Sequence, residues 1–96
     1  MFEIRKSEVF AAWLDALTDV RARARVQARI ERLANGNAGD SKAVGEGVSE
    51  LRIDYGPGYR VYFVKAGRTI LVLLAGGTKS TQSADIKKAL RLARNL

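Results

Sequence analysis

Between positions 48 and 81, where apolar and polar residues alternate, the residues best suited to chemistry are Arg52, Arg60, Tyr62 and Lys79. The segment ELRIDY alternates in the way typical of a strand with one buried face, and YRVYFVK resumes the pattern after a GPG turn. Because side chains alternate along strands, Arg52, Arg60 and Tyr62 are predicted to share one face of a sheet. Arginine stays charged and binds phosphate oxygens in a bidentate manner, so two arginines from adjacent strands can hold one phosphate from two sides.

The turn between these two strands predicts how they pair. A turn that pairs the tyrosines on either side of GPG places Asp54 opposite Arg60 and Arg52 opposite Tyr62. A shift by one residue would expose the apolar positions, so the alternation specifies the register. An alternative interpretation is that the two arginines pair with Glu50 and Asp54 as an ordinary solvated face.

The next segment, TILVLLA, is apolar at successive positions, which predicts a strand covered on both faces. It ends at Gly76 and Gly77, and the polar loop TKST follows. Glycines permit the close approach of a ligand, so Lys79 in this loop is a candidate to reach across the edge of the sheet.

The composition limits the chemistry that the chain can perform. The sequence holds no cysteine and no histidine, which excludes disulfides, thiolate nucleophiles, histidine-based triads and histidine metal sites. Its ten acidic residues form no dense cluster, so a two-metal nuclease is not expected, and no metal or other cofactor is predicted. Acid–base chemistry is left to lysine, tyrosine, arginine or carboxylates.

The 96 residues suffice for one modest core, and a single domain over 1–96 is predicted. No apolar run reaches the length of a membrane span, and the first residues lack the apolar stretch of a secretion signal. Together with the lack of cysteine, these features favour the cytoplasm.

A net charge of +7 makes a polyanion the expected partner, with a basic surface that serves only solubility as the alternative. The charge is concentrated in segments, above all at 20–34, where five arginines accompany one glutamate. Four of them recur at helical spacing, and their mutual repulsion points to an anionic neighbour, either RNA or an acidic protein. These four are Arg21, Arg25, Arg29 and Arg32. A solvated helix face is the alternative for this stripe.

A short strand and two helices are expected before the strands at positions 48–81. Residues 2–6 alternate as a short strand, and Ser7 is a suitable N-cap for a first helix. A second helix begins after Thr18 or Asp19, and the short link makes the two helices an antiparallel hairpin. The apolar stripe of the second helix consists of Ala22, Val26, Ile30 and Leu33.

Residues 35–47 have the composition of a loop. After the sheet, Ser83 or a nearby hydroxyl is expected to cap a last helix. The outer side of this helix carries Lys87 and Arg91, which are further candidates for contact with RNA or a partner protein.

The order strand–helix–helix–strand–strand–strand–helix, with GEGVSELRIDYGPGYRVYF and LLAGGTKSTQSADIKKAL in place, resembles the RelE/ParE toxin superfamily. Within it, the HigB-like addiction module killer branch is the most similar, and the resemblance covers essentially the whole chain. It implies an α+β fold in which a helical hairpin packs against a mainly antiparallel sheet, with a C-terminal helix. It also implies a cognate antitoxin, in this branch a HigA-like helix-turn-helix protein, and a monomeric free toxin.

RelE-like members are ribosome-dependent mRNA endonucleases that drive the 2′-hydroxyl onto the adjacent phosphate and leave a 2′,3′-cyclic phosphate without a metal. By this resemblance, Arg52 and Arg60 bind and neutralise the scissile phosphate, and Tyr62 is a candidate for base stacking or proton transfer. Lys79 matches the basic position at the end of the sheet, where it either accepts the 2′-hydroxyl proton or stays charged and stabilises the transition state. RelE-like enzymes often have a tyrosine or histidine near the C-terminus. None follows Tyr62 here, so the general base is unassigned.

ParE-type members of the superfamily poison DNA gyrase and need no nuclease site, and the fold alone does not separate the two activities. The basic residues at positions 52, 60 and 79 favour the endoribonuclease over the gyrase inhibitor.

Overall fold

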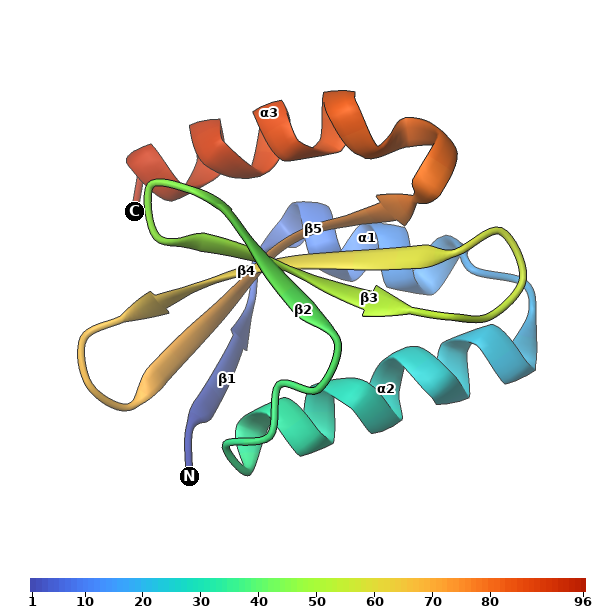
Figure 1. The fold of residues 1–96 in the computed structure, drawn as a ribbon, viewed down its shortest axis with the longest axis horizontal. Coiled ribbons are helices and arrows are strands. Elements are labelled where there is room, and N and C mark those ends of the chain that lie inside the picture. Colours follow the sequence, from blue (N-terminus) through green and yellow to red (C-terminus); the bar gives the residue numbers. More distant parts are fainter.

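Alternating apolar residues assemble one mixed β-sheet, and three α-helices cover its two faces (Figure 1). The computed structural model describes all residues from 1 to 96. In chain order the elements are β1 (Glu3–Lys6), α1 (Glu8–Ala16), α2 (Val20–Ala34), β2 (Ser41–Gly45), β3 (Val48–Ile53), β4 (Tyr59–Ala66), β5 (Ile70–Thr78), the short 3-10 helix η1 (Lys79–Thr81) and α3 (Gln82–Arg94). The predicted α+β class is confirmed.

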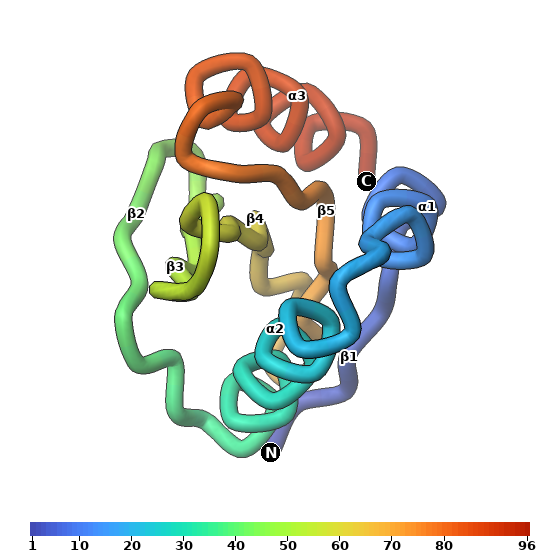
Figure 2. Tube along the Cα trace, turned by 90° about the vertical axis from the view of Figure 1, so that its right-hand side faces the viewer, coloured from blue at the N-terminus to red at the C-terminus, as the bar shows by residue number.

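The strands have the spatial order β1-β5-β4-β3-β2, in which β1 runs parallel to β5 and all other neighbours are antiparallel. Helices α1 and α2 run in opposite directions on one face of the sheet, and α3 lies on the other, so the chain forms three layers (Figure 1, Figure 2). None of the helices is both long and apolar enough to cross a membrane.

Two apolar cores hold the three layers together. The larger lies between the sheet and helices α1 and α2, and it consists of Phe10, Leu14, Ala22, Val26, Ile30, Leu33, Leu51, Ile53, Tyr59, Val61, Phe63, Leu71 and Leu73. The smaller lies under α3 and consists of Val48, Tyr62, Val72, Leu74, Ala75 and Ala89. Strand β5 contributes to both cores, which confirms the prediction of a strand covered on both faces.

Side-chain caps fix the starts of the first two helices. The Ser7 hydroxyl accepts a hydrogen bond from the Phe10 N–H at 3.0 Å, as predicted for the N-cap of α1. The Asp19 carboxylate accepts from the N–H groups of Arg21 and Ala22, so Asp19 rather than Thr18 caps α2.

The pairing of β3 with β4 differs by two positions from the expected one. Arg52 lies opposite Arg60, and Glu50 lies opposite Tyr62. The loop takes in residues 54–58, because positive φ at its two glycines makes a wider turn than a symmetric one around GPG. A shift by two residues keeps every side chain on its face, so the prediction that Arg52, Arg60 and Tyr62 share one face is confirmed.

One further local expectation is wrong, and another is right only in part. The segment 35–47 is not all loop, because Ser41–Gly45 forms the edge strand β2. Its pairing with β3 is irregular near Gly45, and such a short strand carries too little alternation to stand out. Ser83 does not cap α3 but lies within it. A nearby hydroxyl residue, Thr81, does occupy the N-cap position, but its side chain makes no capping hydrogen bond and donates instead to the Asp85 carboxylate at 2.5 Å.

Candidate active site

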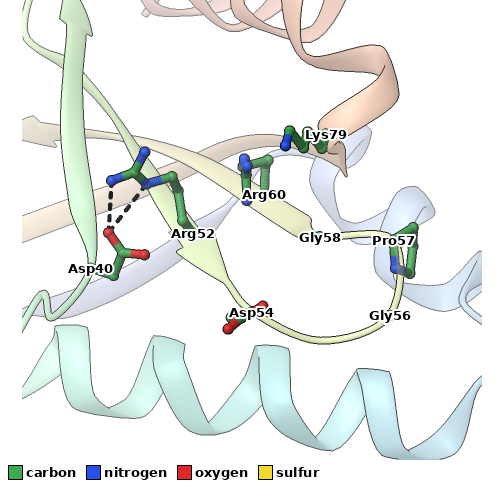
Figure 3. A pocket seen from close by; sticks show the side chains of 8 residues that line it. All are labelled: Asp40, Arg52, Asp54, Gly56, Pro57, Gly58, Arg60 and Lys79. Atoms are coloured by element: carbon green, nitrogen blue, oxygen red, sulfur yellow. Dashed lines mark hydrogen bonds and ion pairs between the residues drawn. The ribbon is translucent and has the colours of Figure 1, made fainter.

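An open polar groove of about 480 Å³ lies on the α3 side of the sheet, where β3, β4 and η1 meet (Figure 3). Three of the four residues predicted for catalysis line it. The full lining is Asp40, Arg52, Asp54, Gly56, Pro57, Gly58, Arg60 and Lys79. With three cations and two carboxylates, the groove is suited to an anionic ligand that also offers hydrogen-bond donors.

The β3–β4 loop brings Lys79 to the two arginines. The Gly58 carbonyl accepts a hydrogen bond from the Lys79 N–H at 2.8 Å, which ties the loop to η1. Gly58 has a φ of +80°, and a Cβ at this position would lie 3.4 Å from the Lys79 Cβ. Glycine is therefore favoured by the backbone conformation, whereas the approach of η1 would leave room for a Cβ in ordinary contact.

Arg52 is the more exposed of the two groove arginines. Its Nε and Nη2 atoms donate to Oδ1 of Asp40 at 3.1 and 2.9 Å. The backbone N–H of Arg52 also donates to the Asp40 carbonyl, at 2.9 Å. One carboxylate thus neutralises part of the charge of Arg52 at the rim of the groove (Figure 3).

Arg60 is held from below by a buried carboxylate. Its side chain is 11% exposed, and its Nε lies 3.8 Å from Oε1 of the completely buried Glu50. The alternative interpretation of this face is therefore half right, because Arg60 does pair with Glu50. The pair is nevertheless buried rather than solvated, so each partner depends strongly on the other.

Tyr62 lies beneath the groove, and its side chain does not reach the groove as predicted. It is completely buried, and its hydroxyl donates to Oε2 of Glu50 at 3.1 Å. Burial, followed by the negative charge of Glu50, raises the pKa of Tyr62 above the ordinary value for tyrosine. A buried hydroxyl that stays protonated is placed neither to stack on a base nor to exchange a proton with a ligand at neutral pH.

Gly76 and Gly77 do not line the groove, so the expectation that they admit a ligand is wrong. A Cβ on Gly76 would lie 2.2 Å from the ring of Trp13, and one on Gly77 would lie 1.8 Å from the Asp85 carboxylate. The two glycines instead let α1 and α3 pack closely against the end of β5. Gly77 thereby helps to place the segment that carries Lys79.

The arginine stripe of α2 divides into two kinds of residue. Arg29 is used inside the fold, because its guanidinium donates to the carbonyls of Arg52, Ala38 and Asp40 at 2.6, 3.0 and 3.2 Å. The remaining members, Arg21, Arg25 and Arg32, are exposed.

Shallow hollows on α2 connect the exposed arginines with the groove. Arg25 stacks over the ring of Tyr55 at 4.7 Å and lines a hollow of about 270 Å³ together with Arg32 and Asp54. Asp54 also lines the main groove, so the two depressions meet at this carboxylate. On α3, Lys87 and Arg91 are exposed as predicted, but neither lines one of these depressions.

Sequence reasoning did not single out two residues that shape the groove. Asp40 reaches Arg52 from a segment expected to be loop, and Gln82 donates to Glu50 at 2.7 Å from the first turn of α3. Glu50 was named as a possible partner of the arginines, since the alternation that places Arg52 and Arg60 on one face places Glu50 there too. Its complete burial depends on α3, which the strand pattern does not reveal.

Comparison with known proteins assigns the chain to a family. Residues 12–96 match the family model described as "Phage derived protein Gp49-like (DUF891)". An uncharacterized protein of Haemophilus influenzae (strain ATCC 51907 / DSM 11121 / KW20 / Rd) is 49% identical over 94 residues, which are 98% of this chain and 95% of that protein. The chain therefore belongs to the Gp49-like phage-derived family, a RelE-like toxin family of toxin–antitoxin systems.

Proposed function

We propose that this chain is a HigB-like toxin that inhibits translation by cleaving mRNA in the ribosome as a metal-independent endoribonuclease. The observation that supports the proposal best is the convergence of Arg52, Arg60 and Lys79 on one open groove of about 480 Å³. The groove is open to solvent and has no hydrophobic residue in its lining, and its cations suit a phosphodiester rather than a small apolar molecule.

The proposed reaction is an internal transesterification. The 2′-oxygen forms a bond to phosphorus while the bond from phosphorus to the 5′-oxygen breaks. The 2′-hydroxyl gives up its proton to a base, and the 5′-oxygen gains a proton. The products are a 2′,3′-cyclic phosphate and a 5′-hydroxyl, and the transition state carries additional negative charge on the phosphate oxygens. Fixed cations aimed at that charge lower the barrier.

Each groove cation has a distinct part in this proposal. Arg60 pairs with the buried Glu50 and presents its terminal amino groups to the phosphate in a fixed position. Arg52 binds the same phosphate from the neighbouring strand. Lys79 either accepts the 2′-hydroxyl proton or remains charged and stabilises the transition state.

The partner proposed for the free toxin is an antitoxin, which membership of a toxin–antitoxin family supports. A HigA-like helix-turn-helix protein is the expected type. The ribosome and its mRNA are the proposed target, reached through the basic surface of a chain with a net charge of +7.

Arg60→Ala tests the proposal most directly. We expect it to abolish growth arrest and to lower cleavage of ribosome-bound mRNA by about 10²–10³-fold, the usual loss for one transition-state donor. Arg60→Lys keeps the charge next to Glu50, so it separates loss of bidentate phosphate binding from loss of folding. Arg68→Ala is the matched control, since it removes an equally charged but exposed side chain.

The measurement is mapping of mRNA 5′ ends in cells that express each variant, with thermal unfolding of the purified proteins alongside. If the unaltered protein produced no new 5′ ends while double-strand breaks accumulated, the chain would instead be a gyrase inhibitor of the ParE type. Lys79→Arg then distinguishes the two roles of the lysine. Full activity excludes Lys79 as the base, whereas loss of cleavage with RNA binding retained favours that role.

A further inference from the structure

Glu50 is the one charged residue that the fold buries completely, and it lies directly beneath the groove. Its Oε2 atom accepts hydrogen bonds from the Tyr62 hydroxyl at 3.1 Å and from Nε2 of Gln82 at 2.7 Å. Its Oε1 atom faces Nε of Arg60 at 3.8 Å and makes no hydrogen bond. Burial of a carboxylate costs free energy of folding unless the charge is compensated. A completely buried glutamate is therefore expected to have a specific role.

We infer that Glu50 is a positioning residue for the groove, which orients Arg60 directly and the start of α3, beside Lys79, through Gln82. The inference rests on the proposed function for its catalytic meaning, but the orientation of Arg60 can be measured without any cleavage. Glu50 itself touches neither the groove nor a ligand in it, since it is buried and does not line the cavity.

The geometry of Arg60 supports this role. The carboxylate attracts the Nε edge of the guanidinium, which leaves the two terminal amino groups for an anion. The only hydrogen bond of these amino groups is a long one, 3.4 Å, from Nη1 to the Tyr59 carbonyl. The position of Arg60 is thus set mainly by the charge of Glu50, and removal of that charge would release the guanidinium toward solvent.

Through Gln82, Glu50 also influences the position of Lys79, the third cation of the groove. Gln82 is the first residue of α3 and directly follows η1, the turn that contains Lys79. Because Gln82 and Arg60 approach different oxygens of one carboxylate, Glu50 links β3, β4 and α3 at a single point. The distance between Arg60 and Lys79 across the groove is therefore expected to depend on it.

The chain supplies a matched pair of variants for the test. Glu50→Gln removes the charge but keeps the shape and an oxygen that accepts from Tyr62 or Gln82. Tyr62→Phe disturbs the same buried network from the other side and leaves the pair with Arg60 intact. A purely structural role for Glu50 predicts that both variants lower the melting temperature and that neither changes the rate at saturation.

The first measurement is the ¹⁵N–¹H signal of the Arg60 Nε–H group in the free protein, assigned by its absence in Arg60→Ala. We expect Glu50→Gln to shift this signal and to accelerate its exchange with water, and Tyr62→Phe to leave it in place. An unchanged signal in folded Glu50→Gln would overturn the inference. This result does not depend on whether the protein cleaves RNA.

The second measurement is single-turnover cleavage of mRNA on programmed ribosomes at saturating protein. Glu50→Gln should lower the saturating rate by about tenfold or more. A transition-state donor such as Arg60 typically contributes about 10²–10³-fold to the rate, and a misplaced Arg60 loses part of that contribution. Tyr62→Phe should stay within about twofold, and Glu50→Gln should cause a clearly smaller loss in an Arg60→Ala background, where only its effect through Gln82 remains. Equal losses in both backgrounds would overturn the positioning role. Absence of cleavage by the unaltered protein would instead refute the proposed function and leave the spectroscopic result to decide.

If Glu50→Gln alone fails to fold, the dependence between the two residues is tested with the double variant Glu50→Gln/Arg60→Met. It contains neither buried charge, so recovery of a cooperative melting transition is expected if the two residues depend on each other. A double variant that remains unfolded would contradict the coupling.

Discussion

Arg52 and Arg60 lie opposite each other on neighbouring strands, yet their charges are compensated in different ways. Arg60 faces a buried carboxylate across 3.8 Å, whereas Arg52 donates twice to one oxygen of the exposed Asp40. An incoming phosphate must compete with Asp40 for Arg52, but it approaches the free side of Arg60. Asp40 is therefore expected to weaken RNA binding while it keeps Arg52 at the rim.

Replacement of Asp40 by asparagine tests this competition. We expect Asp40→Asn to strengthen the binding of a short non-cleavable RNA several-fold, because a negative charge leaves the groove and Arg52 becomes available. The backbone carbonyl of Asp40, which accepts from Arg52 and Arg29, is unaffected by the change. Fluorescence anisotropy measures the affinity, with Asp15→Asn as a control of equal charge on the exposed side of α1. An equal gain in both variants would mean that only net charge matters.

The buried Tyr62 makes a prediction about stability and pH. Its pKa is raised in the folded protein, so folding favours the protonated phenol. The stabilisation is complete below the unfolded pKa of about 10 and is lost as the pH rises above it, by about 1.4 kcal/mol per pH unit. At neutral pH, Tyr62→Phe should cost about 1 kcal/mol for the lost hydrogen bond to Glu50.

Denaturant unfolding at pH 8 and at pH 11 measures this effect. The advantage of the unaltered protein over Tyr62→Phe should shrink or reverse at the higher pH. A gap between the two proteins that stays constant with pH would show that Tyr62 titrates normally and is not buried against Glu50.

At the scale of elements, Arg29 joins α2 to the start of β2 and the end of β3. Its guanidinium satisfies the carbonyls of three residues on two different segments. From the sequence alone, Arg29 is one of four equivalent arginines in the stripe. Helical spacing predicts which side of the helix a residue lies on, but not which groups a long side chain contacts. Only the path of the 35–40 segment over α2 distinguishes Arg29.

Arg29→Ala is expected to lower the free energy of unfolding by about 3 kcal/mol, since the part-buried carbonyls of Arg52 and Ala38 lose a charged donor. Arg21→Ala, which removes an exposed arginine of the same helix, should change it by no more than about 0.5 kcal/mol. Chemical denaturation of the two variants provides the comparison. Similar values for both would mean that Arg29 is solvated in the same way as its neighbours.

The elements with strong periodicity were predictable from the sequence, and the missed features depend on tertiary contacts. The buried stripe of α2 and the shared face of the groove arginines follow from spacing alone. The offset between β3 and β4 depends on a five-residue loop whose glycines permit several turn widths. The roles of Gly76 and Gly77 depend on which elements pack against them. The two glycines were predicted to admit a ligand, but they instead allow the close approach of Trp13 and Asp85.

For the molecule as a whole, the distribution of charge matters more than its sum of +7. The groove and the arginines of α2 lie on different sides of the sheet, but their depressions meet at Asp54. The cations on the outside of α3 have no such connection. An RNA strand held in the groove is therefore expected to continue along α2 rather than along α3.

Two triple variants with the same net charge separate these paths. One removes Arg21, Arg25 and Arg32 from α2, and the other removes Lys87, Lys88 and Arg91 from α3, in each case by substitution with alanine. For single-stranded nucleic acid, each lost phosphate contact lowers the slope of log affinity against log salt by about 0.7. The α2 variant should therefore lose about 2 from this slope, and the α3 variant should lose little.

The affinity of both variants for a non-cleavable RNA is measured between low and physiological salt. All six residues are exposed, so thermal unfolding should show intact folds. Equal slopes in the two variants would mean that the RNA senses only the overall charge of +7, and that the hollows along α2 do not guide it. A larger loss from the α3 variant would place the strand on the opposite side of the groove, alongside the helix that begins next to Lys79.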